Sequence, residues 1–392
     1  LEHVELFHMG QAGELARYPV HWHEAGDAAG SYVRGAAIHH SFSRCVTIHG
    51  TDHVLVEDNV GYEAFGHCFF LEDGAEQGNT FDHNLGLVTR RPGDADALLP
   101  SDNSHPGPGT FWITNPNNSF VNNVAAGSEG VGFWFALPEH PTGPSATDAI
   151  WPRQTPLLRF DQNVAHSNGR DGLHVDRGPQ PSGSTETSYY RPRSVPGDPD
   201  SPGVTAHFTN LTAYQNRNGG AWLRGEDHIV SGAVLADNGV GLTFASDASE
   251  LANSLLVGET ANTGHPRPWE ETGPGGRSLP RPWASDSTIS GFDFYDGTVG
   301  VRNSHFVAFA SRPQRAAAAL SVLDYTDFSL STDNYAAGLT FHETTQRVYL
   351  ETRPVPSDPE SGEDGYRSAV FRDRDGSVTG APGMAVTVDN PL

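Results

Sequence analysis

The segments Cys45-Val-Thr-Ile-His49 and Cys68-Phe-Phe-Leu-Glu72 decide the fold. In both segments the second and fourth residues are apolar, whereas the third and fifth residues differ in chemistry. The same five-residue frame recurs at Pro19–His23, Thr110–Thr114, Gly132–Ala136, Gly172–Asp176, Gly220–Arg224 and Gly241–Ala245. Side chains alternate between the two faces of a β-strand. The pattern therefore predicts strands with the second and fourth side chains inward and the third and fifth outward.

The spacing of this frame predicts how the strands are arranged. The fifth residues of successive segments are separated by 26, 23, 42, 22, 40, 48 and 21 residues. The short intervals fit single coils and the long ones a coil with an insertion, whereas a propeller blade needs about 40–45 residues. Asn59, Asn123 and Asn163 each precede a fifth residue by 13 positions, as expected of asparagines stacked at one turn. We expect an all-β fold, a right-handed parallel β-helix.

We expect this β-helix to occupy residues 1–341, and residues 342–392 to form a C-terminal β unit or the start of a further domain. Long loop insertions rich in Pro, Gly, Ser and Asp are expected on one face, near residues 88–109, 137–156, 178–203 and 258–281. Loops gathered on one side of a rigid scaffold are where binding sites are usually built.

The composition limits the classes of function. The 392 residues carry a formal net charge of −24, and all 24 basic residues are arginine. An acidic surface argues against nucleic acid and anionic membranes as partners. The absence of lysine excludes Schiff-base chemistry. No apolar run reaches the roughly 18 residues that a membrane span needs, so we expect no membrane insertion, and we expect a monomer.

Cys45 and Cys68 are the only cysteines, and both occupy the first position of the frame in adjacent segments. Equivalent residues of neighbouring parallel strands lie roughly 4.8 Å apart, a separation that permits a disulfide. The sequence is equally compatible with two stacked free thiols.

The fifth residues of the first three segments, His23, His49 and Glu72, form one outward column of potential metal ligands. His21, two residues before His23 on the same face, is a possible fourth ligand. Imidazole nitrogens with one carboxylate favour Zn or another divalent transition metal over Ca. The alternative is that these side chains are ordinary polar surface.

The third residues form a second outward column, which is rich in aromatic side chains. It contains His21, Thr47, Phe70, Trp112, Trp134, His174, Trp222 and Thr243. Aromatic rings on successive coils suit a polysaccharide, because the apolar face of a pyranose stacks on them. Alternatively, the insertions fold over these rings and bury them as a second core. The pattern alone does not separate the two interpretations.

Three motifs carry a resemblance to a known family: Arg17-Tyr-Pro-Val-His-Trp-His23, Ala37-Ile-His-His-Ser-Phe-Ser-Arg-Cys-Val-Thr-Ile-His-Gly50 and Gly66-His-Cys-Phe-Phe-Leu-Glu-Asp-Gly74. With them the chain resembles the cell-surface hyaluronidase family. The resemblance implies a right-handed parallel β-helix and hyaluronan depolymerisation outside the cell, so a secreted or extracellular location is expected. The lysine-free acidic composition is more typical of a bacterial than of an animal member.

Together these features predict an enzyme that cleaves a uronic-acid-containing polysaccharide in a groove on the β-helix, either an endo-acting glycoside hydrolase or a lyase. Glu72, Asp73 and His21 are the expected catalytic residues, and His23, His49 and Glu72 the expected metal ligands. The expected substrate-binding residues are Phe70, Trp112, Trp134, His174, Asp176, Trp222 and Arg224. Glu72 and Asp176 would lie three coils, roughly 14 Å, apart, too far for the paired carboxylates of a glycosidase. A non-catalytic polysaccharide-binding β-helix is the alternative.

Overall fold

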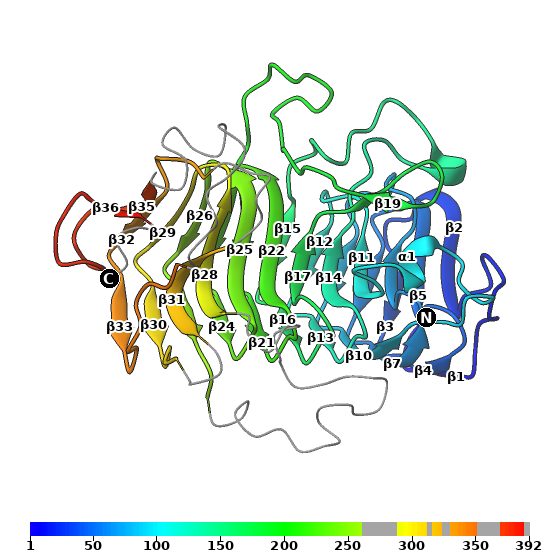
Figure 1. The fold of residues 1–392 in the computed structure, drawn as a ribbon. Coiled ribbons are helices and arrows are strands. Elements are labelled where there is room, and N and C mark those ends of the chain that lie inside the picture. The colour runs from blue at the N-terminus through cyan, green and yellow to red at the C-terminus, as the bar shows by residue number, and fades with distance from the viewer. Residues whose placement is uncertain (261–287, 312–315, 324–329, 351–368, 388–392) are drawn as a thin grey trace.

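The structure, a computed structural model, describes residues 1–260, 288–311, 316–323, 330–350 and 369–387. Over these residues the chain winds into stacked coils of three short strands each, and equivalent strands of successive coils form three sheets (Figure 1). Equivalent strands of successive coils pair in parallel, as β2 (Val20–Asp27) does with β5 (Val46–Asp52), and the exception is the last pair, β35 (Ala369–Asp373) with β36 (Met384–Thr387), which is antiparallel. The predicted parallel β-helix is confirmed.

The three sheets are named by their strand number. The ten-stranded sheet contains β2, β5, β8 (Phe69–Leu71), β11 (Gly109–Ile113), β14 (Val131–Phe135), β17 (Leu173–Val175), β22 (Gly219–Glu226), β25 (Val240–Asp247), β28 (Ile289–Asp296) and β31 (Ala317–Val322). The eleven-stranded sheet contains β1 (Glu5–Phe7), β4 (Ala37–Ser41), β7 (Val60–Phe65), β10 (Leu85–Arg90), β13 (Val124–Ala126), β16 (Val164–His166), β21 (Thr212–Tyr214), β24 (Val234–Ala236), β27 (Leu255–Val257), β30 (His305–Val307) and β33 (Thr340–His342). The twelve-stranded sheet contains β3 (Tyr32–Arg34), β6 (Leu55–Glu57), β9 (Thr80–Asp82), β12 (Ser119–Val121), β15 (Arg159–Asp161), β20 (Ala206–Thr209), β23 (His228–Ser231), β26 (Ser249–Ala252), β29 (Val299–Arg302), β32 (Tyr335–Ala337), β35 (Ala369–Asp373) and β36 (Met384–Thr387).

The register of the ten-stranded sheet is the one that the sequence frame predicts. Thr47 pairs with Phe70, and the series continues through Trp112, Trp134, His174, Trp222 and Thr243 without a slip. The inward residues are buried at 2% exposure or less: Val46, Ile48, Phe69, Leu71, Phe133, Phe135, Leu173, Val175, Leu223 and Phe244. Inward phenylalanines stack from coil to coil, with 4.6 Å between the ring centroids of Phe69 and Phe111.

A ladder of buried asparagines supports one turn of the helix. The side-chain amide Nδ2 of Asn59 donates to Oδ1 of Asn84, Asn84 donates to Asn123, and Asn123 donates to Asn163, at 2.9–3.1 Å. Three of these residues were predicted from the 13-residue spacing. Asn84 escaped the pattern because the insertion after β10 lengthens the interval that follows it.

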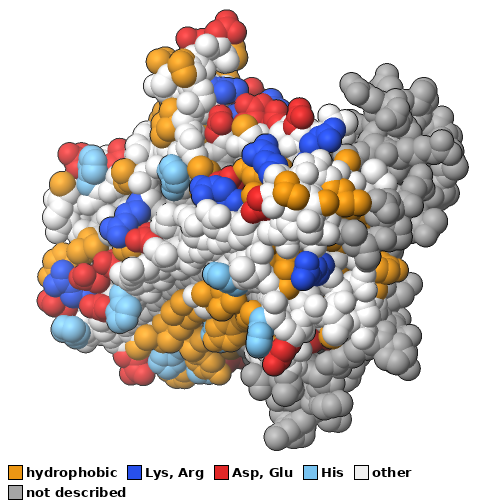
Figure 2. All heavy atoms as spheres, turned by 90° about the vertical axis from the view of Figure 1, so that its left-hand side faces the viewer, with side chains coloured by type: hydrophobic (Ala, Val, Ile, Leu, Met, Phe, Trp, Pro, Cys, Tyr) orange, Lys and Arg blue, Asp and Glu red, His pale blue; other side chains and the backbone are white. Residues whose placement is uncertain are grey.

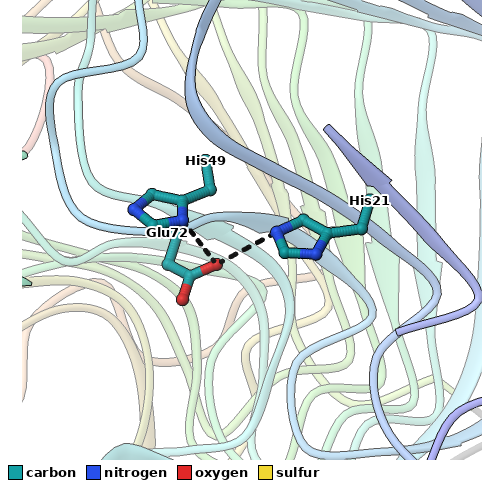
Figure 3. Close-up of side chains that lie close together, drawn as sticks. All are labelled: His21, His49 and Glu72. Atoms are coloured by element: carbon teal, nitrogen blue, oxygen red, sulfur yellow. Dashed lines mark ion pairs between the residues drawn. The ribbon is translucent and has the colours of Figure 1, made fainter. Parts of the chain in front are cut away.

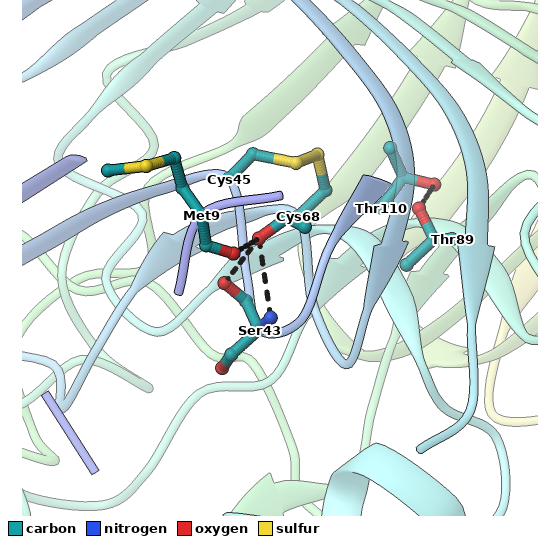
Figure 4. Close-up of a disulfide and its surroundings, with 7 residues drawn as sticks. Met9, Ser43, Cys45, Cys68, Thr89 and Thr110 are labelled. Atoms are coloured by element: carbon teal, nitrogen blue, oxygen red, sulfur yellow. Dashed lines mark hydrogen bonds between the residues drawn. A yellow bond between two sulfur atoms is a disulfide. The ribbon is translucent and has the colours of Figure 1, made fainter. Parts of the chain in front are cut away.

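Cys45 and Cys68 form a disulfide that joins two successive coils inside the helix (Figure 4). The bonded alternative of the sequence analysis is therefore the one present. Gly61 of β7 faces the bond, and a Cβ atom there would lie 2.5 Å from Sγ of Cys68. Glycine thus leaves the room that the two sulfur atoms occupy. Beside the bond, the hydroxyl groups of Thr89 and Thr110 lie 3.0 Å apart.

The long insertions leave the coils at the borders of the ten-stranded sheet. The segment 88–109 joins β10 to β11 and contains α1 (Pro100–Asn103), and 137–156, after β14, contains η1 (Gly143–Ser145). The segment 178–203 follows β17 and contains the antiparallel pair β18 (Gly178–Pro179) and β19 (Thr185–Glu186). The segments after β14 and β17 project at the top of Figure 1. Of the expected insertion 258–281, residues 261–281 lie outside the described residues.

Beyond residue 341 the described strands still belong to the twelve-stranded sheet. β35 pairs in parallel with β32, and β36 pairs antiparallel with β35. Residues 351–368 and 388–392 lie outside the described residues. In the part of the chain that is described, no helix combines the length and the apolarity needed to cross a bilayer.

The outer surface of the eleven-stranded sheet departs from the usual inward-apolar, outward-polar alternation. Outward-facing Val60 pairs with Leu85, which pairs with Val124, followed by Val164. Val60 is 39% exposed, and the other three are half-buried. A space-filling view also shows hydrophobic side chains gathered in one area of the surface, with histidines at its edge (Figure 2).

Candidate functional site

Three side chains from β2, β5 and the end of β8 converge over the outer face of the ten-stranded sheet. The carboxylate Oε2 of Glu72 lies 3.9 Å from Nε2 of His21 and 3.8 Å from Nδ1 of His49. One ligand atom from each of the three residues lies within 4.8 Å of the other two. Figure 3 shows both imidazole rings directed at the same carboxylate oxygen. His21, His49 and Glu72 are called the polar cluster below.

His23 was predicted as a ligand with His21 as a possible fourth one, and the structure brings His21 to the group instead of His23. The backbone of His23 pairs with that of His49, as the column predicts. Its ring stands edge-on to the ring of His49, with 4.9 Å between centroids, but His23 is not part of the three-residue group of ligand atoms. The register fixes where a residue lies on the sheet, whereas side-chain torsions decide which way its ring leans. Glu72 leans toward the column of His21.

Asp73 orients His49. Oδ2 of Asp73 lies 3.0 Å from Nε2 of His49, and this hydrogen bond raises the pKa of His49 to about 9 against the opposing effect of burial. The same oxygen accepts the backbone N–H of Ser145, from the 137–156 insertion, at 3.3 Å. Burial works to raise the pKa of Asp73, but these hydrogen bonds outweigh it and lower that pKa. A carboxylate that holds one imidazole nitrogen leaves the other nitrogen directed at the cluster, as in many metal sites.

Burial sets the charge states of the other two cluster residues. It lowers the pKa of His21 to about 4, so that His21 is neutral at physiological pH. It also raises the pKa of Glu72, although the charges of His49 and Arg44 oppose this effect. The side chains of His21 and Glu72 retain 12% and 16% exposure.

Glu76 is a further part of the site that the sequence analysis missed. Its two oxygens accept the backbone N–H groups of Gly50 and Gly74 at 3.0 and 2.9 Å, and so connect β5 to the turn that follows β8. Burial and the charge of Asp73 raise the pKa of Glu76 to about 8. Glu76 lies outside the repeated frame, so its spacing carried no signal.

Several buried polar atoms at the site have no hydrogen-bond partner among the described residues. They are Nε2 of His21, Oε2 of Glu72, Oδ1 of Asp73, Oγ1 of Thr47 and the hydroxyl of Tyr18. Thr47 pairs with His21 on the neighbouring strand, and the ring of Tyr18 lies 5.0 Å from that of His21. Buried polar groups are normally paired in native proteins. Two imidazole nitrogens and one carboxylate oxygen are a donor set that fits a divalent transition metal.

The aromatic side chains of the neighbouring coils are buried instead of open to a ligand. Phe70, Trp112 and Trp134, called the aromatic cluster below, are 1% exposed or less and pack with Leu99 of the 88–109 insertion. The prediction that these three rings bind sugar is therefore wrong for this structure, and the second-core alternative describes them. The insertion folds across the sheet and removes the rings from solvent.

A buried ion pair fixes this insertion to the sheet. Nη1 of Arg44 lies 2.5 Å from Oδ1 of Asp102 in α1, and both side chains are 1% exposed. The guanidinium of Arg44 also lies 4.3 Å from the ring centroid of Phe70. The charges of both groups are thus held directly against the aromatic cluster.

The remaining predicted substrate-binding residues form a separate network. Oδ2 of Asp176 accepts hydrogen bonds from Nε1 of Trp222 at 3.0 Å and from Nε of Arg224 at 2.8 Å. Nδ1 of His174 lies 2.9 Å from Oδ2 of Asp171. The strands β8, β11, β14 and β17 are consecutive in the sheet, so this network lies three strands from Glu72.

Comparison with known proteins connects this architecture to a family. The family model described as "CEMIP beta-helix" matches residues 1–173. The human protein "Cell surface hyaluronidase CEMIP2" is 37% identical over 437 aligned residues, covering 97% of this chain and 31% of that protein. The mouse "Cell migration-inducing and hyaluronan-binding protein" is 38% identical, covering 100% of this chain and 32% of that protein. The chain belongs to the CEMIP family. This is the cell-surface hyaluronidase family that the motifs indicated.

Two further facts define this CEMIP-family chain. It spans about a third of the length of these relatives. The matched residues 1–173 contain the whole polar cluster with Asp73 and Glu76, whereas the network around Asp176 lies beyond them. Among solved structures, the A-module of the Azotobacter vinelandii mannuronan C-5 epimerase AlgE4 is 14% identical with a TM-score of 0.44, covering 84% of this chain and 86% of that one. That distant likeness has no bearing on function.

Proposed function

We propose that this chain is the β-helix of an extracellular enzyme that depolymerises a uronic-acid-containing polysaccharide, with hyaluronan as the first candidate. The observation that carries the proposal is the convergence of His21, His49 and Glu72, with unpaired buried ligand atoms, on a β-helix of this family. The names of the human and mouse relatives, a hyaluronidase and a hyaluronan-binding protein, support hyaluronan.

The polar cluster would hold a divalent transition metal through nitrogens of His21 and His49 and an oxygen of Glu72. Such an ion supplies positive charge that neutralises a uronate or activates water. Asp73 keeps Nε2 of His49 engaged, so that Nδ1 faces Glu72. Burial keeps His21 neutral, which is the state that binds a metal, whereas His49, whose pKa is raised to about 9, would have to lose the proton on Nδ1 to bind one.

Acid–base chemistry would fall to the carboxyl groups at the same place. Oδ1 of Asp73 has no partner among the described residues, which leaves it able to accept a proton. Burial raises the pKa of Glu72, and this direction suits a general acid. The proposal covers hydrolysis and elimination alike.

A non-catalytic, polysaccharide-binding β-helix is the second candidate. The observation that favours it is the low exposure of the cluster, since a long polymer needs more open access than 12–16% exposed side chains provide. Binding without cleavage would then use other parts of the outer face.

The test is size fractionation of fluorescent hyaluronan, chondroitin and alginate after incubation with the chain. We expect wild type to shorten hyaluronan, and Glu72→Gln to lose activity by about 10²–10⁴-fold. The matched control Glu5→Gln, at a side chain that is 70% exposed on β1, should keep full activity. Binding of all three polymers without any shortening would establish the non-catalytic candidate. Ultraviolet absorbance of unsaturated uronate then separates elimination from hydrolysis.

Metal binding is tested separately by elemental analysis of protein purified without chelator. We expect a stoichiometric transition metal in wild type and its loss in His49→Ala, because β5, which carries His49, lies between the strands of the other two ligands. His53→Ala is the matched control, since His53 is an exposed imidazole that pairs with Asp27. Wild type free of metal, with activity that survives a chelator, would leave Glu72 and Asp73 as direct acid–base groups.

A further inference from the structure

A group of cations surrounds β17, in a chain whose net charge is −24. Arg170 lies just before β17 and Arg177 just after it, so the two flank His174, the outward residue in the middle of the strand. His105, from the 88–109 insertion, contacts the guanidinium of Arg170. Four basic residues from two segments, 170–177 and the 88–109 insertion, therefore lie around one strand.

The pKa shifts of His105 and Arg170 show that these basic groups interact with one another. The pKa of His105 is lowered to about 4, first by burial and then by the charges of Arg170, His174 and Arg177. Burial lowers the pKa of Arg170 as well, and the charges of Arg91, Arg217 and Arg177 add to this effect, whereas the charge of Asp171 opposes it. His105 is therefore neutral at physiological pH, and the arginines supply the positive potential that attracts an anion.

The nearby carboxylate of Asp171 is already engaged by other groups. Its Oδ2 holds Nδ1 of His174, and its Oδ1 accepts the side-chain amide of Asn218 at 2.7 Å and the backbone N–H of Gly219 at 2.9 Å. Asp171 therefore fixes the position of His174 and neutralises only part of the surrounding positive charge.

Two nitrogen atoms at this place are buried without a partner among the described residues. They are Nε2 of His174, whose side chain is 6% exposed, and Nε of Arg177. Because His174 binds Asp171 through Nδ1, its Nε2 faces away from that carboxylate. Buried nitrogens that lack a partner, beside an excess of positive charge, indicate a missing oxyanion.

We propose that His174, Arg170, Arg177 and His105 form a subsite for the carboxylate of a uronic acid in the bound polysaccharide. Arginine presents paired N–H donors that match the two oxygens of a carboxylate. The subsite lies three strands from Glu72, roughly 14 Å along the sheet, and one polymer chain bound at both places would cross over the 88–109 insertion, which covers the strands between them. The choice of polysaccharide as the ligand rests on the proposed function.

The experiment is calorimetric titration of a defined hyaluronan oligosaccharide into Arg177→Gln, with Arg159→Gln as the matched control. Arg159 is an exposed arginine of β15, on a different sheet, paired with Asp161. Arg177→Gln removes the charge and the guanidinium N–H donors and leaves a shorter, neutral polar side chain, and Arg159→Gln makes the same chemical change. We expect it to raise Kd about tenfold and to flatten the salt dependence of binding, with Arg159→Gln equal to wild type. Arg170→Gln should behave like Arg177→Gln.

Chemically modified ligands identify the anion. Carboxyl-reduced hyaluronan should bind weakly, and equally to wild type and Arg177→Gln. If carboxyl-reduced chondroitin sulfate still shows the difference between the two proteins, the subsite takes a sulfate and the carboxylate assignment is overturned. Equal Kd and salt dependence for wild type, Arg170→Gln and Arg177→Gln would overturn the subsite itself.

Measurement of depolymerisation alongside binding separates this inference from the proposed function. Arginine-dependent binding in a chain that cleaves no polysaccharide would contradict the enzyme and leave the subsite in place. Cleavage with a KM that is unchanged in Arg177→Gln would leave the enzyme in place and contradict the subsite.

Discussion

The polar cluster and the aromatic cluster occupy the same outer face of the ten-stranded sheet, yet they differ in what covers them. His21 and Glu72 keep part of their side-chain surface exposed, whereas Phe70, Trp112 and Trp134 have almost none. Both clusters point outward in one unbroken register. The register therefore determines that a side chain points outward, but not whether it is exposed or buried. The path of the 88–109 insertion decides whether an outward side chain is covered by a loop or remains accessible to a ligand.

The largest effect on stability is expected in the aromatic cluster, which is a second core only if folding depends on it. We expect Trp134→Ala to lower the free energy of unfolding by about 3–5 kcal/mol, as for other buried aromatic residues. The measurement is urea unfolding followed by circular dichroism. His21→Ala, from the polar cluster, is the control and should change stability far less. Equal stability of Trp134→Ala and wild type would instead restore Trp134 as a sugar-binding residue.

The anchor of the covering insertion provides the second prediction. Asp102→Asn removes the charge that balances the buried guanidinium of Arg44, and we expect a loss of about 3 kcal/mol, the lower end for breaking a buried pair. The asparagine retains an oxygen for the backbone N–H groups of Leu98 and Leu99 that Asp102 now accepts. A loss below about 1 kcal/mol, typical of a surface pair, would contradict the anchoring role.

The pH dependence of that loss tests its electrostatic origin. Burial opposes ionisation of Asp102, but the charge of Arg44 outweighs it, and the pKa of Asp102 in the folded state is lowered. Its contribution to stability is therefore present above the unfolded pKa of about 4 and disappears as the pH falls through the folded pKa. Wild type and Asp102→Asn should converge in stability as the solution is acidified below that range. A difference that persists unchanged in acid would point to packing instead of charge.

The smallest change in unfolding free energy is expected at Trp222, which belongs to the same outward column but is less buried than Trp112 and Trp134. Trp222 is half-buried, and its Nε1–H donates to Asp176. Trp222→Phe keeps a ring and removes this donor, so we expect a loss of about 1 kcal/mol in unfolding free energy. Arg224 still holds the carboxylate of Asp176 in this variant. A loss as large as that of Trp134→Ala would extend the covered region to Trp222.

The inward side chains of the coils could be predicted from the sequence because two independent periods agree on them. The alternation within Val46–Ile48 and Phe69–Leu71 and the coil spacing between them leave one register, and burial enforces it. The stacked Asn59, Asn123 and Asn163 followed from the same spacing. Asn84 did not, because an insertion interrupts the count.

The candidate site could be predicted only in part. His21, His49 and Glu72 were all named, but the column placed His23 nearer to Glu72 than His21, since it locates backbones and not ring torsions. Whether Trp112 and Trp134 are buried depends on the 88–109 insertion. This segment is rich in Pro, Gly and Asp and has no repeating pattern from which its path could be predicted. The sequence therefore predicts which side chains point outward from the β-helix better than it predicts which of them the loops bury.

The disulfide between Cys45 and Cys68 has a consequence for how the site comes apart. In a solenoid each coil contacts only its neighbours, so two coils separate when the contacts at their common junction fail. The disulfide closes the junction between the strand of His49 and that of Glu72. No disulfide joins β2 to β5, and their junction is held by hydrogen bonds, packing and the contact of Asp27 with His53. Partial opening of the helix would therefore detach His21 and leave His49 and Glu72 tethered to each other.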